Sequence, residues 1–548
     1  MSEENKANQS DQTPPAAQPA AAPPAPHMPV YMSAIYIAAS VLMWSTRGLS
    51  MYFISANTQQ IQGSLGATLT ETSWLIAAYM APYASLTILL VKIRTQFGLR
   101  RFAEIAIAVF LVSSLLHLLV YDIWSAIPIR FIAGAAAAPV STIGFLYMLE
   151  AFPPPKKMTW GGLSLALTCS AAAGPLARVI SPLLFDIGQW QQLYMVEIGL
   201  SLAAFAVVYI LPMTQAPRAK VLHWLDFVAY GLIAIGFGLL AVVLVQGKNY
   251  WWFEAPWIGI CLAISIAALA CAAALELNRE QPLMNLHWLF SPEILRFTLI
   301  LFIFRIVLAE QTTGAVGLFQ AFGLQDGQSR GLYLVILVAS LAGGIACGMW
   351  MKLERVSFIF GLALVFIAVG AFLDSHATNL TRPHNAYLSQ GLIAFGGALF
   401  LPPAMLAGIT KALKQGPTYM TSFIVIFLFT QNIGGLIGSA VFSTFITIRE
   451  KYHSAYLVEQ LVMSNPIVAQ RVQALSGTYA KVLADQGLTR AEGLALLGQQ
   501  VTKEATVLSY NDAFLAISVI ALLSLACLIA YRLYEKMQAR RHSATMAG

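Results

Sequence analysis

Charged side chains inside long apolar segments are the residues of this chain whose types could do chemistry. Arg130 lies in the apolar segment 125–150, and Glu310 lies in the apolar segment 295–320. A charge within such a segment is costly in a membrane and is normally retained where it faces a cavity or another polar group. A buried carboxyl group can gain and lose a proton, whereas an arginine stays protonated. The two residue types together indicate proton handling and charge recognition inside a membrane.

The composition of the chain is that of an integral membrane protein. Of its 548 residues, 58% are hydrophobic and 10% are charged, and the mean hydropathy is +0.70. Soluble domains carry about 25% charged residues, so this chain has too few charges for a water-facing surface. The net charge of +7 falls in alternate loops, which indicates membrane topology rather than a nucleic-acid site. The five cysteines lie in apolar segments without Cys-x-x-Cys spacing, so we expect neither a metal nor a cofactor.

Fourteen apolar segments are long enough to cross a bilayer, which takes about 20 residues in a helix. The predicted spans are 31–56, 72–93, 102–121, 125–150, 159–184, 193–213, 223–246, 255–276, 295–320, 330–351, 356–374, 385–410, 418–447 and 511–533. Basic residues gather in the loops that follow the even-numbered spans. This distribution predicts that both termini are cytoplasmic.

Two segments outside these spans are distinctive. Residues 1–27 are rich in proline and alanine and cannot build a core, so we expect a disordered cytoplasmic tail. Residues 448–510 separate the last two spans and carry apolar residues at roughly helical spacing. This spacing favours a helical periplasmic element over the alternative, a mobile linker.

Several motifs follow one another along the spans in a characteristic order. They are Trp74 with Tyr79, Arg130 with Gly134 and Pro139, Gly174-Pro175, Asp226, Glu276 with Leu283, the run from Gln431 to Gly438, and Tyr510-Asn511-Asp512-Ala513-Phe514. In their order and spacing they resemble the fourteen-helix drug–proton antiporters of the major facilitator superfamily, the EmrB/QacA type.

This resemblance implies an all-α integral membrane protein with the major facilitator fold, in which two additional central helices accompany two six-helix bundles. The expected boundaries are 28–213 for the N-terminal bundle, 214–290 for the additional helices with their cytoplasmic linkers, and 291–548 for the C-terminal bundle. The last range includes the long periplasmic loop.

The same resemblance implies a proton-driven transporter, not an enzyme, that exports amphipathic small molecules or drugs across a bacterial inner membrane. It also implies two protein partners, a periplasmic adaptor and an outer-membrane channel, in a tripartite efflux system. An exporter dedicated to a native metabolite, such as an organic acid or a siderophore-like compound, remains an alternative, as does a non-transporting sensor or scaffold. The sequence lacks the Walker pattern and the common hydrolase motifs, which disfavours ATP-driven transport and a membrane enzyme.

Glu310 is the predicted proton-coupling carboxyl group, and the resemblance assigns Arg130 to orienting the proton path or the substrate. The alternative for Glu310 is a structural pair with an arginine of another helix, such as Arg47 or Arg130. The predicted substrate pathway comprises Arg47, Arg305, Gln311, Gln431 and Asn432, although the last two could instead hydrogen-bond between helices. The resemblance assigns conformational roles to Gly98, Arg100, Arg101, Gly134, Pro139, Gly174 and Pro175.

The chain also departs from the family pattern. Thr95 stands where the family has a loop aspartate, and Ser50 stands where it has a carboxylate in span 1. The charges within the spans are mostly positive: Arg47, Arg130, Arg178 and Arg305 against Glu197 and Glu310. This balance predicts an amphipathic anion or weak acid as the preferred substrate, rather than a quaternary ammonium compound. Glu197, near the outer end of span 6, is expected to be hydrated.

Overall fold

The computed structural model describes residues 29–152, 161–185, 191–214, 218–279, 282–478 and 485–546, so the predicted tail 1–27 lies outside the described residues. Helices form the regular structure within these ranges. The main helices are α1 (Val30–Ala56), α2 (Thr58–Leu65), α3 (Leu69–Phe97), α4 (Leu99–Leu116), α5 (Ile123–Glu150), α7 (Gly161–Phe185), α8 (Gln191–Ile210), α9 (Trp224–Gln246), α10 (Pro256–Leu277), α11 (Leu286–Leu289), α12 (Pro292–Ala309), α13 (Val316–Ala321), α14 (Asp326–Trp350), α15 (Val356–Asp374), α16 (Tyr387–Gln415), α17 (Pro417–Glu459), α18 (Pro466–Ser476) and α19 (Gln486–Met546).

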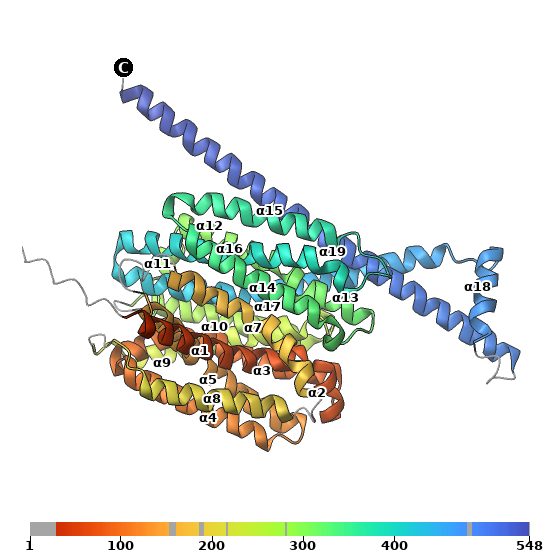
Figure 1. Ribbon diagram of the computed structural model, residues 1–548, viewed down its shortest axis with the longest axis horizontal. Helices are drawn as coiled ribbons and strands as arrows, with labels where there is room; N and C mark the ends of the chain where they lie inside the picture. Colours follow the sequence, from red (N-terminus) through yellow and green to blue (C-terminus); the bar gives the residue numbers. More distant parts are fainter. Residues whose placement is uncertain are drawn as a thin grey trace, which may run out of the picture.

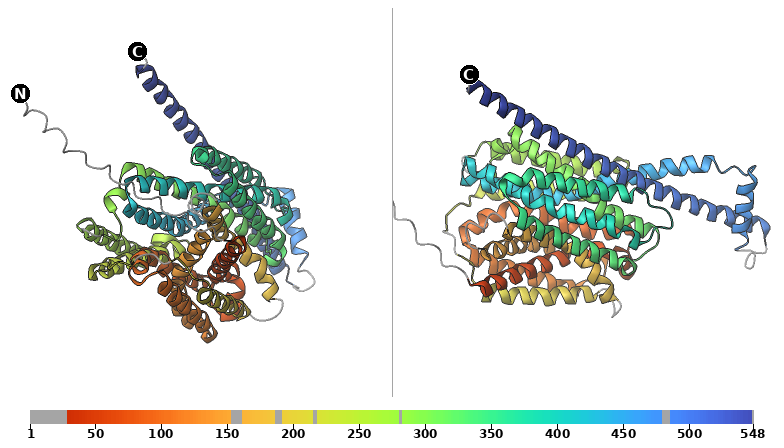
Figure 2. Two further views of the ribbon diagram at one scale, coloured as in Figure 1. Left: turned by 60° about the vertical axis from the view of Figure 1, so that its left-hand side comes forward. Right: turned by 45° about the horizontal axis from the view of Figure 1, so that its top comes forward.

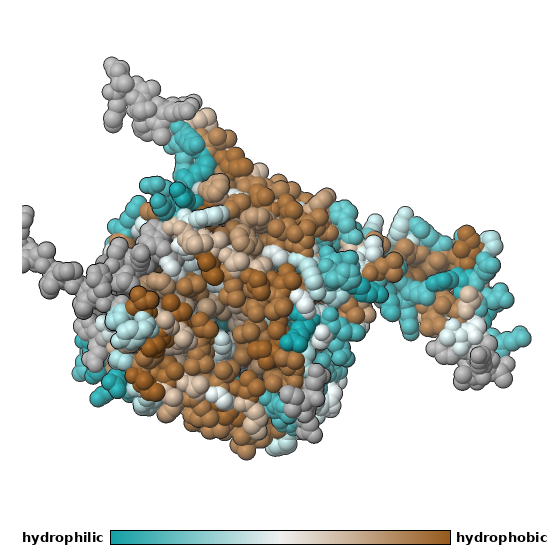
Figure 3. All heavy atoms as spheres, viewed as in Figure 1, coloured by the Kyte–Doolittle hydropathy of each residue, from teal (hydrophilic) through white to brown (hydrophobic). Residues whose placement is uncertain are grey.

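Most of these helices lie side by side along one direction (Figure 1). The face shown in Figure 3 is hydrophobic across its middle, and hydrophilic residues gather toward its two ends. Within the described ranges, twelve helices are long and apolar enough to cross a membrane. The chain is therefore a multi-pass membrane protein. We call α1 to α8 the amino-terminal helices and α12 to α19 the carboxyl-terminal helices.

Two of the fourteen predicted spans are helical but are not among these twelve. The first is α1, which carries the polar residues Thr46, Arg47 and Ser50. The second is divided, because α12 ends at Ala309 and a π-helical turn, η3 (Glu310–Ala315), precedes α13. Such turns insert an extra residue into a helix and often occur at functional sites. The polar residues in both segments thus distinguish them from the twelve apolar spans.

The amino-terminal and carboxyl-terminal helices meet closely along α7 and α14. Ser164 in α7 donates a hydrogen bond to the backbone oxygen of Gly344 in α14, at 2.6 Å. A Cβ atom at Gly344 would overlap the side chain of Thr168, so glycine permits this approach. Further along the same helices, the Arg178 guanidinium binds both carboxylate oxygens of Asp326, at 3.0 and 2.9 Å. Arg178, one of the charges counted within the spans, therefore joins the two groups of helices.

Charged residues attach the α9–α10 hairpin to α3. Asp226, whose side chain is fully buried, accepts hydrogen bonds from Lys92 of α3 at 2.8 Å and from Arg279 at 2.7 Å. Arg279 also pairs with Glu276 at 2.7 Å. The aspartate and glutamate singled out in the sequence thus form one ion network at the same end of the hairpin.

The end of α17, the helix α18 and the beginning of α19 extend beyond the other helices (Figure 1, Figure 2). We call these elements the arm. Within the described part of residues 448–510 the arm is mostly helical. It is anchored where Arg449 and His453 both contact Asp512, each at 2.6 Å.

Replacing Asp226 by asparagine is expected to lower the free energy of unfolding by about 3 kcal/mol, because it leaves Lys92 and Arg279 without their shared buried anion. Unfolding of the purified protein in detergent measures this change. Glu104→Gln is the control, because it removes the exposed Arg100–Glu104 pair and is expected to cost less than about 1 kcal/mol. Equal stability of the two variants would contradict this role of the network.

Candidate functional site

A buried and a half-buried carboxyl group share one amide donor. Gln390 of α16 donates from Nε2 to Oε1 of Glu310 at 2.8 Å and to Oδ2 of Asp374, the last residue of α15, at 2.7 Å. The hydroxyl group of Ser389 donates to the other oxygen of Asp374. Glu310 and Gln390 are both 0% exposed. We call Glu310 and Asp374 the carboxyl pair.

The carboxyl pair is suited to holding a proton. Its two groups lie within hydrogen-bonding reach of each other, and Oε2 of Glu310 has no hydrogen-bond partner among the described residues. Two ionised carboxylates so close together in a buried site repel each other. A proton held by the pair removes that repulsion and provides a donor for an oxygen that otherwise has none.

Sequence analysis identified Glu310 but missed Asp374 and Gln390. Asp374 lies at the end of an apolar segment beside other polar residues, where an aspartate is ordinary. Gln390 carried a usable signal, because it is an amide at the start of an otherwise apolar span. Among the described residues Glu310 makes no ion pair with Arg47 or Arg130; it accepts from Gln390, while Arg130 donates to the Ser50 carbonyl group and Arg47 to the Tyr83 hydroxyl group.

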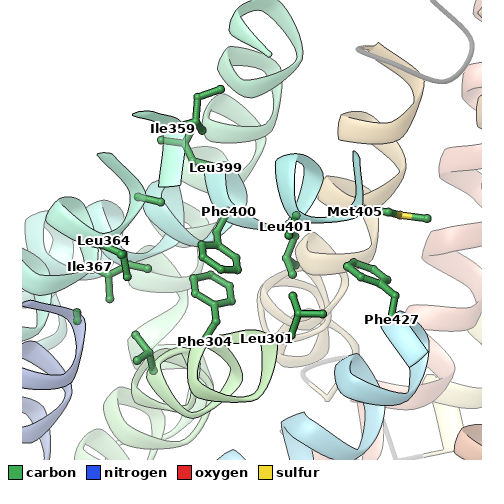
Figure 4. Packing of buried hydrophobic residues seen from close by; sticks show 14 of the residues in the cluster. Leu301, Phe304, Ile359, Leu364, Ile367, Leu399, Phe400, Leu401, Met405 and Phe427 are labelled. Atoms are coloured by element: carbon green, nitrogen blue, oxygen red, sulfur yellow. The ribbon is translucent and has the colours of Figure 1, made fainter. Parts of the chain in front are cut away.

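Aromatic packing fixes the helix that carries Glu310. Phe304 of α12 stacks on Phe400 of α16 with ring centroids 3.5 Å apart, and Phe400 also contacts Phe360 of α15. Figure 4 shows Phe304 and Phe400 facing each other between their helices. The helices that carry Glu310, Gln390 and Asp374 are thus held together by this apolar cluster.

Arg130 of α5 is 1% exposed and binds backbone and aromatic groups instead of a carboxylate. Its Nη1 donates to the backbone oxygen of Ser50 at 2.9 Å, and its guanidinium lies 4.4 Å from the centroid of the Tyr79 ring. Ser50 therefore accepts a hydrogen bond from Arg130 through its backbone carbonyl group.

Glu197 of α8 is 1% exposed, which corrects the expectation that water surrounds it, because η1 (His117–Leu119) and α4 pack over it. Ser114 of α4 donates to its Oε1 at 3.1 Å. Its other oxygen, Oε2, has no hydrogen-bond partner among the described residues.

Arg47 of α1 is also satisfied in part by aromatic rings. Its Nη2 donates to the hydroxyl group of Tyr83, and its guanidinium lies 4.7 Å from the Tyr83 ring and 5.6 Å from the Trp44 ring. Cation–π contacts of this kind stabilise a cation without neutralising it. Within the described ranges Arg47 has no carboxylate partner, so its charge is available to an anion.

Nε of Arg305, in α12, has no hydrogen-bond partner among the described residues. Glycines of α17 make room for it: a Cβ atom at Gly435 would collide with Nη2 of Arg305, and one at Gly438 would lie 2.7 Å from its backbone oxygen. Tyr52 of α1 lies near the guanidinium groups of both Arg305 and Arg47. The two cations thus approach one tyrosine from different groups of helices.

Two side-chain amides of α17, about one helical turn before the glycines that face Arg305, are further donors. Gln431 and Asn432 precede the Gly434-Gly435 pair on α17, and their amide nitrogens have no acceptor among the described residues. Nε of Arg305 and Nε of Arg47 also lack acceptors. We call Arg47, Arg305, Gln431 and Asn432 the donor cluster. Gln311 differs, because it donates to the backbone oxygen of Gln390 at 3.2 Å and so lies next to the carboxyl pair.

The glycines and prolines with expected conformational roles lie at close helix contacts or within helices. A Cβ atom at Gly134 of α5 would overlap the backbone of Tyr79 in α3, and one at Gly174 of α7 would lie 3.5 Å from Tyr52. Pro139 and Pro175 lie inside α5 and α7. The Gly174-Pro175 motif thus borders the tyrosine that lies near Arg47 and Arg305.

The remaining motif residues lie where α3 turns into α4. Gly98 has a φ of 82°, a left-handed conformation that favours glycine, and a Cβ atom there would lie 2.6 Å from Nε of Arg218. Arg100 pairs with Glu104 at 2.9 Å, and Arg101 is exposed. Thr95 donates to the backbone oxygen of Val91 at 2.9 Å.

The sequence and the fold are similar to those of known proteins. The family model described as Major Facilitator Superfamily matches residues 35–439. The multidrug export protein EmrB of Escherichia coli K12 is 23% identical over 471 residues, covering 83% of this chain and 86% of EmrB. The fatty acid resistance protein FarB of Neisseria gonorrhoeae is 23% identical and covers 84% of this chain and 88% of FarB.

Solved structures show the same fold at lower identity. The human organic anion transporter MFSD10 (TETRAN) gives a TM-score of 0.53 at 10% identity, covering 90% of this chain and 100% of that one. A POT family transporter in complex with a thioalcohol conjugated peptide gives a TM-score of 0.53 at 12% identity, covering 91% and 96%. At these identities the likeness concerns the fold alone.

Gly438→Ala is expected to lower the free energy of unfolding by about 1–3 kcal/mol, because its methyl group would press on the α12 backbone. Gly435→Ala is the matched comparison and is expected to cost less, because its methyl group meets only the mobile end of the Arg305 side chain. Unfolding of both variants in detergent measures the difference. A larger loss of unfolding free energy in Gly435→Ala would contradict the close contact between Gly438 and the α12 backbone.

Proposed function

Since the chain belongs to the Major Facilitator Superfamily, we propose that it is a proton-driven antiporter that exports amphipathic organic anions across a bacterial inner membrane. The observation that carries this proposal is the donor cluster, in which one side-chain nitrogen of each cation and amide, from two groups of helices, has no acceptor among the described residues. The resemblance to EmrB over 83% of the chain supports an export role.

The proposed substrate class follows from the hydrogen-bond acceptors and the negative charge that the donor cluster lacks among the described residues. A buried donor without an acceptor costs about 1–3 kcal/mol, and more when it is charged. A carboxylate or sulfonate would supply acceptor oxygens and negative charge to Arg47 and Arg305 together. The apolar side chains around them suit the rest of an amphipathic molecule. FarB, named for fatty acid resistance, is a relative whose name mentions such an anion.

The carboxyl pair is the proposed proton site, and it is linked to the substrate site through one helix. Arg305 and Glu310 are five residues apart, about 7.5 Å along a helix axis, and the π-helical turn begins at Glu310. Gaining or losing a proton changes the hydrogen bonds of the pair, and α12 can transmit that change to Arg305. If the carrier switches between its two access states only with bound substrate or with a protonated carboxyl pair, it exchanges substrate for protons.

We further propose that fourteen helices cross the membrane: the twelve described above, α1, and the segment from α12 to α13. They would form two six-helix bundles, 28–213 and 291–548, with α9 and α10 between them in 214–290. The distribution of basic residues supports cytoplasmic termini. In this topology the arm lies in the periplasm, where it would meet an adaptor protein that leads to an outer-membrane channel.

Transport in liposomes tests the proposed function. The full-length protein is reconstituted into vesicles loaded with taurocholate, an amphipathic sulfonate, or with ethidium, a permanent cation. An acidic outer solution is expected to speed taurocholate release by at least about ten-fold, which corresponds to about 1.4 kcal/mol. Ethidium release is expected to remain unchanged. Gradient-driven release of ethidium alone would contradict the proposed substrate class.

Glu310→Gln and Asp374→Asn are each expected to abolish the effect of the proton gradient, because each leaves only one carboxyl group in the pair. The double variant is expected to lose no more of the gradient-driven release than either single variant, because the two carboxyl groups act as a unit. Glu254→Gln makes the same chemical change at an exposed position and should behave as wild type. If either single variant keeps the full gradient effect, the coupling group lies elsewhere.

Arg305→Gln is expected to raise the Kd for taurocholate about ten-fold or more, because a charge-assisted hydrogen bond contributes about 1.5–3 kcal/mol. Tryptophan fluorescence of the purified protein reports binding, since Trp44 lies beside Arg47. The control, Arg355→Gln, removes an exposed arginine that is not part of the donor cluster. Equal affinities for both variants would exclude Arg305 from the substrate site.

A further inference from the structure

A groove of about 670 Å³ lies between α15 and α19, at the edge of the carboxyl-terminal helices. The two helices pack against each other, and α19 leaves the other helices toward its carboxyl-terminal end (Figure 1, Figure 2). Ser518 of α19 donates to the backbone oxygen of Ala368 in α15 at 2.9 Å, beyond one end of the groove. Near the other end, Arg532 of α19 donates to the hydroxyl group of Ser357 in α15. The apolar part of the groove lies between these two contacts.

The walls of the groove are apolar along both helices. They include Phe358 and Leu362 on α15 and Leu525, Ile529 and Leu533 on α19. Residues four apart lie on the same face of a helix, so each helix presents a continuous apolar stripe to the groove. The stripe on α19 extends about 12 Å along the helix axis. This shape suits an extended hydrocarbon chain that lies along the helices.

Gly361 of α15 also lines the groove and keeps it open. A Cβ atom there would lie 3.6 Å from Cδ1 of Leu525 and 4.0 Å from Cδ2 of Leu528, which is ordinary van der Waals contact. The packing of α15 on α19 therefore does not require glycine at this position, although glycine inside a helix is destabilising relative to alanine. The missing side chain provides space for an occupant of the groove.

Two basic side chains line the end of the groove where α15 begins. They are Arg532 and Lys536, which lie one turn apart on the same face of α19 and are both exposed. Arg532 pairs with Glu535 at 3.1 Å. An exposed ion pair of this kind contributes little to stability, so a stronger anion can replace Glu535. The two cations are thus accessible to a ligand in the groove.

Acidic groups are outnumbered at this end. Glu354, in the turn η4 (Leu353–Arg355) before α15, lines the groove, and Lys352 and Arg355 are its neighbours in the chain. Together with the three charged residues of α19, this end carries four basic and two acidic side chains, all of them exposed. The charge therefore favours a negatively charged ligand.

The basic end of the groove lies at the depth of lipid headgroups. Tyr531 and Tyr534 stand on either side of Arg532 in the chain and are exposed, whereas Leu522 and Leu523, earlier on α19, are exposed apolar residues that suit the interior of a membrane. Tyrosines are enriched where a membrane meets water. The helix thus passes from the hydrocarbon region to the headgroup region where its basic residues begin.

We propose that the groove binds an anionic phospholipid, whose phosphate group contacts Arg532 and Lys536 and one of whose acyl chains lies along the apolar walls. Basic pockets between membrane-spanning helices suit such headgroups. Binding is non-covalent. The groove is distinct from the donor cluster and from the carboxyl pair, so this inference does not rest on the proposed function. In the proposed topology the bound lipid belongs to the cytoplasmic leaflet.

Native mass spectrometry of the full-length protein, titrated in detergent with phosphatidylglycerol, measures the Kd of the first bound lipid. Phosphatidylcholine with the same chains but no net charge is expected to bind about ten-fold more weakly or worse. Replacing both Arg532→Gln and Lys536→Gln is expected to raise the Kd for phosphatidylglycerol about ten-fold and to leave that for phosphatidylcholine unchanged. The control carries Arg490→Gln and Lys503→Gln, the same changes at exposed positions of α19 in the arm, and should bind as wild type does.

Gly361→Leu tests the apolar part of the site, because its side chain would fill the groove. It is expected to raise the Kd for both lipids about ten-fold. Gly199→Leu is the control, since Gly199 is exposed on α8 and a Cβ atom there would have no contact within 4 Å. Glycerol 3-phosphate, which has the phosphate group without the chains, is expected not to displace phosphatidylglycerol.

Equal affinities of wild type for the two lipids would overturn the inference, as would an unchanged affinity for phosphatidylglycerol in Gly361→Leu or in the variant without Arg532 and Lys536. Displacement by glycerol 3-phosphate would also overturn it, because the ligand would then be a free phosphate ester. If Gly361→Leu does not fold, the variant without the two basic residues decides, since both side chains are exposed. None of these measurements includes a transport step.

Discussion

The amide of Gln390 holds together a buried carboxyl group, Glu310, and a half-buried one, Asp374, and the proposed proton coupling depends on this contact. One nitrogen donates to Glu310 and to Asp374, at 2.8 and 2.7 Å, and the pair has no cation beside it among the described residues. The site is therefore sensitive to a single proton. The interrupted helix at Glu310 and the aromatic packing of Phe304 on Phe400 position the three residues.

Three arginines within the helices, Arg47, Arg130 and Arg305, are held without a carboxylate partner among the described residues. Arg130 uses a carbonyl group and a ring, Arg47 uses two rings and a hydroxyl group, and Arg305 lies in a space that glycines of α17 leave open. Among the described residues these three arginines are thus kept apart from carboxylates, whereas Arg178 pairs with Asp326. This separation leaves the cations free for an anion and the acids free for protons, which is the chemical basis of the proposed exchange.

Hydrophobic patterning was sufficient to predict the helical membrane fold and to single out Glu310, because a charge within an apolar segment stands out in one dimension. It could not find Asp374, an ordinary residue at a helix end, since its pairing depends on how α15 packs against α16. Gln390 lies 80 positions from Glu310, a contact that no local pattern encodes. Glu197 was misjudged for a similar reason: its position near a helix end suggested water, but a neighbouring turn covers it.

The most direct test of the central claim observes the proton on the carboxyl pair itself. Infrared difference spectra of the full-length protein in nanodiscs, recorded between high and low pH, resolve the C=O stretch of protonated carboxyl groups. We predict a band in wild type and in Glu254→Gln that both Glu310→Gln and Asp374→Asn remove, because the proton belongs to the pair. If the band is the same in all four proteins, the pair does not bind the proton and the account is wrong.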